Sequence, residues 1–289
     1  MSGQGSDHGH VFFVGPRKTG TTALYDILRE SGTAISPKVK ESFFFDQLEP
    51  ELAQYESLFG LDPGRPFIEV SPSYFTSDQA SANIARLFPQ ARIVVTLRHP
   101  VRRALSALLH AGRIGLLRDA DVERPTLNSK HVCHILDGSS YSRHLVRWSE
   151  FFPGRVLVLK QESTGTYSKE SIAPLGQFIG VPLSASGLAA RRVNQAREPR
   201  FVPAVRLARG CKRVLVGLQA FQLVRRLKIL ESLLFKRARS LVGSPAESFF
   251  TTHLAEEVRV FDAAPRAAVL RCAQAGACPW CSAVGSSPQ

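Results

Sequence analysis

Cysteine is scarce in this sequence, and long uninterrupted apolar runs are missing. The 289 residues include five cysteines, an odd number scattered along a chain too large for a disulfide scaffold, so we expect reduced thiols. No apolar stretch reaches the roughly 18 residues that a membrane-spanning helix needs. The first ten residues, MSGQGSDHGH, lack the charged start and apolar centre of a secretory signal. We therefore expect a cytoplasmic protein.

Acidic residues are few relative to basic ones. The chain has 24 Asp and Glu against 37 Lys and Arg, a formal net charge of +13. Such a surplus favours anionic partners: nucleotides, phosphorylated cofactors, nucleic acid or a membrane surface. Charge alone does not choose among them. The apolar fraction of 44% is sufficient for the core of a large α/β domain.

The chain has no internal repeat, and only its ends, 1–9 and 282–289, have the composition of disordered segments. We predict a single domain over 1–289. Short apolar runs predict strands, and apolar periodicity between prolines predicts helices. The expected strands are 11–14, 66–70, 92–97 and 156–160, and the expected helices include 77–88, 101–111 and 141–152. This alternation predicts an α/β fold with three layers, a central parallel β-sheet flanked by helices.

Two segments interrupt the alternation. Residues 112–140 mix charge, Gly and Pro without a clean period, which is typical of a long surface excursion beside a pocket. Residues 212–242 are helix-like, very apolar and interleaved with Lys and Arg. We predict that 200–242 is a helical cover over the domain, and contact of 212–242 with a membrane surface is the alternative.

The first strand runs into a basic turn, GPRKTGTT, that precedes a helix-like stretch. Backbone N–H groups at a helix N-terminus bind phosphate or sulfate oxygens, and glycines let a ligand approach the backbone. The nucleoside triphosphate version of this loop has its lysine after the second glycine. Here Lys18 precedes Gly20, which indicates an anion-binding loop of another kind. A capped helix after a basic turn is the structural alternative.

A second anion site is predicted at LRHPVRRALS, residues 97–106. Arg98 follows a strand, and ligands of open α/β sheets collect at the carboxyl ends of strands. An arginine fork with the hydroxyl of Ser106 on the next helix suits a second phosphate. We expect Arg102 and Arg103 to be solvated helix charges.

Several motifs follow one another in the order found in PAPS-dependent sulfotransferases, and the chain resembles the branch that contains heparan sulfate sulfotransferases and many bacterial enzymes. The motifs are GPRKTGTTAL, KESFFFD at 40–46, IEVSPSYF at 68–75, LRHPVRRALS and YSRHLVRWSEFFPGRVLVL at 141–159. Beyond them, RVN at 192–194 and HLAEEVRVF at 253–261 are similar to late elements of the family. The likeness extends over residues 10 to about 180 and less sharply beyond.

The resemblance implies a donor, an activity and a set of site residues. The donor is 3′-phosphoadenosine 5′-phosphosulfate (PAPS), whose sulfuryl group passes to a hydroxyl or amine of an acceptor without a metal. Lys18 would stabilise the leaving nucleotide. The 5′-phosphosulfate would be bound by Arg17, Lys18, Thr19, Gly20, Thr21 and Thr22, and the 3′-phosphate by Arg98 and Ser106.

Glu41 matches the glutamate that serves as general base in the glycosaminoglycan branch, in Glu41-Ser42-Phe43-Phe44-Phe45-Asp46. The alternative is that it only pairs with Lys38 or Lys40. Other branches use histidine, so His99, His110 and His134 stay open as bases. Phe43 to Phe45 are expected in the core and pocket wall.

One position departs from the glycosaminoglycan enzymes. Their motif E-K-[ST]-P-x-Y-F carries a second lysine, where this chain has Val70. A heparan-type acceptor is therefore disfavoured, and we expect a small-molecule, lipid or glycoside acceptor with Glu69, Ser71 and Tyr74 on its side of the site.

Two other functions stay open on the sequence. A nucleotide-dependent kinase with a variant loop would need a metal-binding aspartate at a strand end, where this chain has Arg98. A nucleic-acid binder would explain the charge but lacks an aromatic-interleaved basic motif, so no nucleic-acid partner is expected. Cys272, Cys278 and Cys281 lack a fourth ligand at zinc-finger spacing, so we expect no metal site there.

Overall fold

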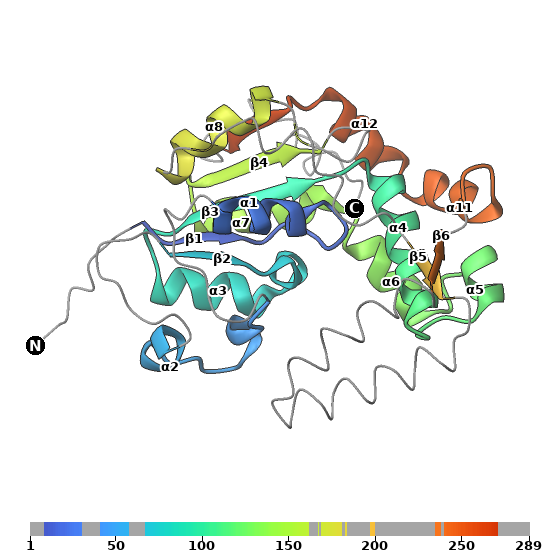
Figure 1. The fold of residues 1–289 in the computed structure, drawn as a ribbon, viewed down its shortest axis with the longest axis horizontal. Coiled ribbons are helices and arrows are strands. Elements are labelled where there is room, and N and C mark those ends of the chain that lie inside the picture. Colours follow the sequence, from blue (N-terminus) through green and yellow to red (C-terminus); the bar gives the residue numbers. More distant parts are fainter. Residues whose placement is uncertain are drawn as a thin grey trace, which may run out of the picture.

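The computed structural model describes residues 9–30, 41–57, 67–161, 167, 169–180, 183, 197–199, 235–237 and 240–270. Five strands form the central sheet in the order β2-β1-β3-β4-β7 (Figure 1). They are β1 (Val11–Phe13), β2 (Ile68–Val70), β3 (Arg92–Leu97), β4 (Val156–Lys160) and β7 (Ala267–Leu270). The first four are parallel, which confirms the predicted α/β architecture. β7 pairs antiparallel with β4, a strand that the sequence did not predict.

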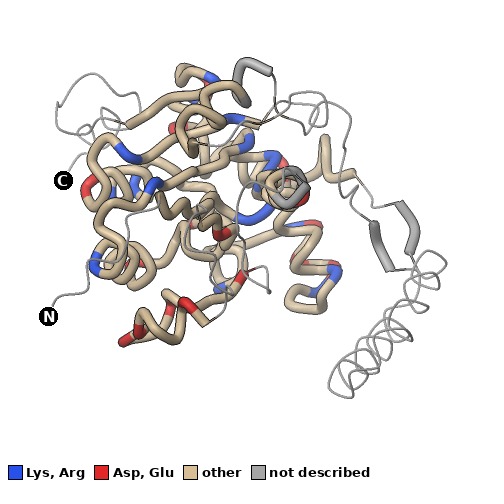
Figure 2. The backbone as a smooth tube through the Cα atoms, turned by 60° about the vertical axis from the view of Figure 1, so that its left-hand side comes forward, with Lys and Arg blue, Asp and Glu red and all other residues tan. Residues whose placement is uncertain are grey.

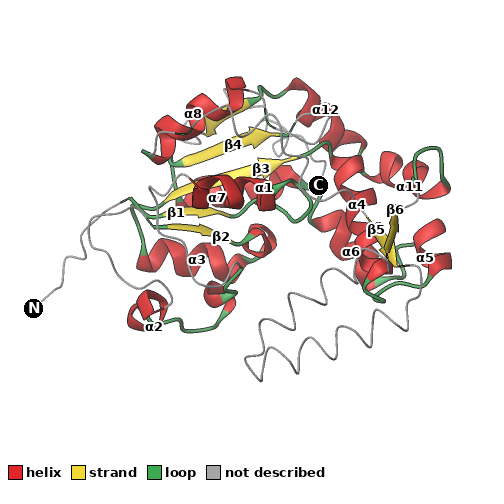
Figure 3. Cartoon of the chain, in the orientation of Figure 1, coloured by secondary structure: helices red, strands yellow, loops and turns green. Residues whose placement is uncertain are grey.

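Each face of the sheet carries its own apolar cluster, because alternate residues of a strand point to opposite faces. Phe12 and Val14 face α3 (Asp78–Leu87) and α7 (Tyr141–Phe151). Val11 and Phe13 face α1 (Thr21–Glu30) and α8 (Lys169–Ile179). In the view of Figure 3, α1 and α7, which cover opposite faces of the sheet, overlap near its middle.

A third apolar cluster surrounds α4 (Pro100–Arg113), the helix that follows β3. It buries Val101, Leu105 and Leu108 against α5 (Asp119–Glu123), α6 (Lys130–Asp137) and α11 (Pro245–His253). The prediction of an irregular excursion over 112–140 was therefore wrong in detail. Its two short helices form because a few apolar residues, Val122, Val132 and Ile135 among them, are buried against α4, which a local period does not reveal.

The helix predicted over 212–242 does not extend through its last part. Its residues Phe235–Arg237 form strand β6, which pairs antiparallel with β5 (Arg197–Pro199). Because β5 lies far from β6 in the sequence, the local apolar pattern could not indicate this strand. Residues 212–234, most of the predicted cover, lie outside the described residues, as do 282–289 and all of 1–9 except Gly9.

Short elements complete the described chain: η1 (Phe44–Asp46), α2 (Leu52–Ser57), η2 (Pro72–Thr76) and α12 (Ala255–Ala263). Of the helices that the structure describes, none is both long and apolar enough to cross a bilayer.

Candidate active site

The basic loop occupies the carboxyl end of β1, where it connects this strand to α1. Lys18 has a φ of 77° and Gly20 a φ of 83°. The left-handed region is strained for a lysine, at a cost of about 1–3 kcal/mol, and such residues cluster at functional sites. The turn leads directly into the N-terminus of α1 at Thr21, which is where an anion-binding loop holds its ligand.

The two glycines let the loop pack closely against the sheet. A Cβ on Gly15 would lie 2.4 Å from the backbone nitrogen of Thr96 in β3, and one on Gly20 would lie 2.4 Å from Nε2 of Gln161. The sequence predicts that these glycines serve the close approach of a ligand. The contacts show that they first permit close approach of the loop to the strands behind it.

Thr19 belongs to the internal support of the loop. Its side chain is fully buried, donates to the carbonyl of Pro16 at 2.7 Å and shares a hydrogen bond with Thr96 at 2.8 Å. Its own carbonyl accepts from the hydroxyl of Tyr167 at 2.5 Å. A ligand would therefore meet the backbone of Thr19 and not its hydroxyl. Thr21 is buried at the start of α1, and Thr22 beside it is half-buried.

Positive charges surround Lys18. Burial, followed by the charges of Arg113, Arg98 and Arg103, lowers the pKa of the Lys18 ammonium from 10.5 to about 8. No carboxylate contacts this ammonium within the described part of the chain. Mutual repulsion among these cations destabilises the protonated form of Lys18, and a bound anion would stabilise that form.

Arg103 corrects the expectation of a solvated helix charge, because it is buried. It donates from Nε to the carbonyl of Arg17 at 3.0 Å and from one terminal nitrogen to Ile135 O at 2.7 Å and Ser139 Oγ at 3.0 Å. Burial lowers its pKa to about 10. Arg103 thereby connects the loop to the C-terminal end of α6, whereas Arg102 is exposed as expected.

One face of α4 carries the second predicted anion site. Arg103, Ser106, His110 and Arg113 follow one another at spacings of three and four residues, which places them along one stripe of the helix. Ser106 is half-buried between Arg103 and Arg113, both of which act on the pKa of Lys18. Arg98, directly after β3, is half-buried, and its carbonyl accepts from Tyr141 at 2.8 Å. The structure thus brings the two predicted anion sites close together.

Glu41 lies at the mouth of the loop. Its Oε2 is 3.3 Å from a terminal nitrogen of Arg17, whose guanidinium also lies over the ring of Phe43 at 5.6 Å. The described partner of Glu41 is therefore in the loop; Lys38 and Lys40 lie outside the described residues. Glu41 has a φ of 62° and Phe43 a φ of 56°, so strained residues stand on both sides of Ser42.

Glu69 in β2 is a buried carboxylate whose hydrogen bonds, within the described part of the chain, all come from hydroxyl groups. Its Oε1 accepts from Ser42 and Ser71 at 2.6 Å and from Tyr74 at 3.0 Å. Its Oε2 accepts from Tyr55 at 2.8 Å. Burial, and next the charge of Glu69, raise the pKa of both tyrosines, so that both stay donors. We call Ser42, Tyr55, Glu69, Ser71 and Tyr74 the hydroxyl cluster.

The three residues predicted to face the acceptor are inside this cluster. Glu69, Ser71 and Tyr74 are each at most 1% exposed, and the hydrogen bonds of their side chains are internal. Contact of these residues with an acceptor stays a prediction. Their described contacts support the segment that carries Glu41.

Comparisons with known proteins agree on a single family. A model described as the sulfotransferase family matches residues 40–185, about half of the chain. The chain belongs to the sulfotransferase family.

Among curated sulfotransferases, the chain is similar to human heparan sulfate glucosamine 3-O-sulfotransferase 6, 39% identical over 157 residues that make up 50% of this chain and 43% of that protein. It is also 26% identical over 195 residues to the Bos taurus bifunctional heparan sulfate N-deacetylase/N-sulfotransferase 2, over 58% of this chain and 21% of that protein. The matches thus span less than half the length of these relatives. A solved sulfotransferase from Alicyclobacillus acidocaldarius has the same fold, with a TM-score of 0.53, 20% identity, and coverage of 72% of this chain and 92% of that one.

These comparisons support the sulfotransferase interpretation over its two alternatives. The family and the three relatives named above are all sulfotransferases, and neither a kinase nor a nucleic-acid-binding protein is among them. In the view of Figure 2, the Lys and Arg residues of the described chain are spread over several elements, with Asp and Glu between them.

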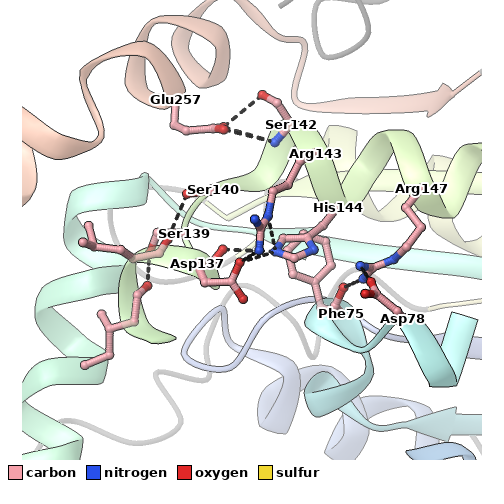
Figure 4. A network of polar contacts seen from close by, with 12 residues as sticks. Phe75, Asp78, Asp137, Ser139, Ser140, Ser142, Arg143, His144, Arg147 and Glu257 are labelled. Atoms are coloured by element: carbon pink, nitrogen blue, oxygen red, sulfur yellow. Dashed lines mark hydrogen bonds and ion pairs between the residues drawn. The ribbon is translucent and has the colours of Figure 1, made fainter. Parts of the chain in front are cut away.

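A polar network connects α7 to η2 and to the C-terminal end of α6 (Figure 4). Arg147 donates to the carbonyl of Phe75 at 2.6 Å and pairs with Asp78. His144 is buried with its Nε2 3.0 Å from Asp137, and burial, then the charges of Arg147 and Arg143, lower its pKa to about 3. His144 is therefore a neutral structural residue. The network fixes η2, and with it the hydroxyl of Tyr74.

The three histidines considered as bases lie at the start of α4, on α4 and on α6. His99 caps the start of α4 and packs against Phe261 at 5.9 Å. The Nδ1 of His110 contacts Arg113 at 2.8 Å, and His134 is exposed on α6. Glu41, in contrast, contacts Arg17 of the loop directly.

Three contributors to the site, Arg103, Arg113 and Ser42, are not predicted from the sequence. The spacing of Arg103 and Arg113 around Ser106 on one helix face was the signal available for the two arginines. No sequence pattern marked Ser42 as a site residue, because its contribution is a hydrogen bond to Glu69, which is distant in the sequence.

Proposed function

We propose that this sulfotransferase transfers a sulfuryl group from PAPS to a hydroxyl or amine of a small-molecule, lipid or glycoside acceptor. The observation that carries the proposal is the half-buried Lys18 among three arginines, with a pKa lowered to about 8, in a loop that resembles the donor-binding loop of PAPS-dependent sulfotransferases. A donor with a 5′-phosphosulfate and a 3′-phosphate matches two adjacent cationic sites.

The residues present fit this donor by charge and geometry. The backbone of 17–22 and the helix N-terminus of α1 would hold the 5′ group, and Arg98 with Ser106 the 3′-phosphate. Arg103 keeps the loop in place through the carbonyl of Arg17. PAPS supplies the activated sulfuryl group.

In the proposed reaction the acceptor atom forms a bond to sulfur as the bond from sulfur to the bridging oxygen breaks. The ammonium of Lys18 stabilises the negative charge that develops on that oxygen. Glu41 takes the proton that the acceptor loses. Arg17 holds Glu41 at the mouth of the loop, so that base and lysine flank one reaction centre.

The proposed acceptor class rests on one substitution within a family motif. Val70 is 1% exposed and packs among apolar residues in the cluster with α1 and α8, at the position where the glycosaminoglycan enzymes have lysine. An apolar residue there supports an acceptor with fewer negative charges than heparan sulfate. An alkyl glycoside or another uncharged hydroxyl compound fits this better than a sulfated polysaccharide.

Donor binding is tested by thermal unfolding. 3′-Phosphoadenosine 5′-phosphate (PAP), at about 100 times its Kd, is expected to stabilise the protein by about 2.7 kcal/mol, and ATP with Mg²⁺ much less. A response to ATP equal to or larger than that to PAP would overturn the donor assignment.

Transfer is tested with radiolabelled PAPS and three acceptors: an alkyl glucoside, an N-deacetylated heparosan oligosaccharide and a heparan sulfate oligosaccharide. Lys18→Ala is expected to lower kcat at least about a hundredfold, and Arg98→Ala to raise chiefly the KM for PAPS. Normal turnover in the first variant would remove Lys18 from the mechanism.

A further inference from the structure

The buried carboxylate of Glu69 has no cation beside it in the described part of the chain, which is unusual for an acidic group inside a protein. Four hydroxyl groups from η2, α2 and the segment around Ser42 satisfy it instead. A cluster of this kind is costly unless every member is satisfied. Through its hydrogen bond with Ser42, the residue next to Glu41, Glu69 can hold the segment that carries the proposed base.

We infer that Glu69 is a positioning residue, which holds Glu41 toward the transferring sulfuryl group through the hydroxyl of Ser42. The inference rests on the proposed function of Glu41 as the base. Glu69 itself touches neither the donor nor the acceptor in this scheme.

Ser42 is the connection between the two carboxylates. It lies between Glu41 and Phe43, both with a left-handed φ, and its hydroxyl donates to Glu69 at 2.6 Å. Strained backbone of this kind persists only where neighbouring contacts fix it. The short hydrogen bond from Ser42 to a carboxylate is such a contact, because a charged acceptor strengthens it.

The same cluster also fixes the residues that follow. The amide of Phe44 donates to the hydroxyl oxygen of Ser42 at 3.2 Å, and the amide of Phe45 to Tyr74 at 3.4 Å. Ser42 can accept from Phe44 because its own proton is committed to Glu69. A carboxylate only accepts, so it directs every hydroxyl of the cluster inward. An amide in its place would put a donor against those hydroxyls.

Two variants that each remove one hydrogen-bond donor to Glu69 separate an effect on the position of Glu41 from an effect on protein stability. Ser42→Ala removes the bond between Glu69 and the segment of Glu41, together with the contacts of the Ser42 hydroxyl with Tyr74 at 2.9 Å and with the Phe44 amide. Tyr55→Phe removes a bond of similar length, 2.8 Å, to the other oxygen of Glu69 from α2, away from Glu41. We expect both to lower Tm, because each leaves Glu69 with one donor fewer, and Ser42→Ala more so, because the Phe44 amide also loses its acceptor.

Only Ser42→Ala is expected to impair the reaction. Its kcat should fall about ten- to a hundredfold with the acceptors used above, with the KM for PAPS within about twofold of wild type. Glu69→Gln should behave alike, and Tyr55→Phe should keep its kcat within about twofold. Equal losses of kcat in Ser42→Ala and Tyr55→Phe, or none in either, would overturn the inference.

Hydrogen exchange supplies a second measurement that needs no turnover. The amides of Phe44 and Phe45 should exchange faster in Ser42→Ala than in Tyr55→Phe at matched Tm. If the wild type transfers no sulfuryl group, the proposed function fails, and exchange still decides whether Ser42 fixes this segment. Identical exchange in the two variants would refute the positioning by Ser42.

Discussion

At the scale of single residues, the left-handed backbone occurs where the chemistry is proposed. Within the described residues, the non-glycine residues with positive φ are Lys18, Glu41 and Phe43. Two of them are the proposed catalytic lysine and base, and the third follows Ser42. Such strain is maintained by the fold around it, here by Arg103 behind the loop and by the hydroxyl cluster beneath Glu41.

The lowered pKa of Lys18 gives a prediction about stability. Because this pKa is about 8 in the folded protein against 10.5 ordinarily, the unfolded chain binds the proton more tightly, and the charge destabilises the fold at neutral pH. Lys18→Met should therefore raise the stability of the donor-free protein by roughly 1–3 kcal/mol near pH 7, an advantage that shrinks above the folded pKa. Chemical denaturation of both proteins across pH measures it.

The same variant tests donor binding. Protonated Lys18 attracts PAP, so wild-type affinity should fall about tenfold from about pH 7 to about pH 9, and Lys18→Met should show a nearly flat profile over this range. Parallel profiles for the two proteins would contradict a contact between Lys18 and the nucleotide.

At the scale of elements, the loop depends on packing against strands that follow it in sequence. Gly154 is a matched control for Gly20. Both have a positive φ, at 69° and 83°, but a Cβ on Gly154 would meet nothing within 4 Å. Gly154→Ala should cost about 1 kcal/mol from backbone conformation alone. Gly20→Ala adds a clash with Gln161 and should cost more.

Gly20→Ala should also weaken PAP binding, whereas Gly154→Ala should leave it unchanged, as calorimetric titration of both variants can show. Equal effects on stability and on PAP binding would mean that the close approach to Gln161 has no part in shaping the loop.

The helices also show which elements a local sequence pattern can predict and which it cannot. The helix expected at 101–111 proved to be Pro100–Arg113, because an N-terminal proline and a regular apolar stripe specify it locally. α5 and α6 were missed, because their few apolar residues become significant only against α4. β7 was missed too, since an alanine-rich strand of four residues has no distinctive pattern.

At the scale of the whole molecule, the charge of +13 acts as a background field around the specific cations of the site. A field of this kind attracts polyvalent anions and is screened by salt. PAP affinity should fall severalfold between about 50 mM and about 500 mM NaCl, a range in which the Debye length drops from roughly 14 Å to roughly 4 Å. A neutral osmolyte at equal osmolality is the control and should leave the Kd unchanged.

The sequence by itself indicated the family and four of the strands, and it singled out Lys18, Arg98 and Glu41 as candidate site residues. Those features are local: a strand, a turn and a helix start are encoded in consecutive residues, and a family motif is read in sequence order. Tertiary structure alone decided that Arg103 supports the loop, that Glu69 is enclosed by hydroxyls and that Glu41 meets Arg17. Burial and hydrogen-bond partners depend on residues distant in the chain, and no local pattern contains them.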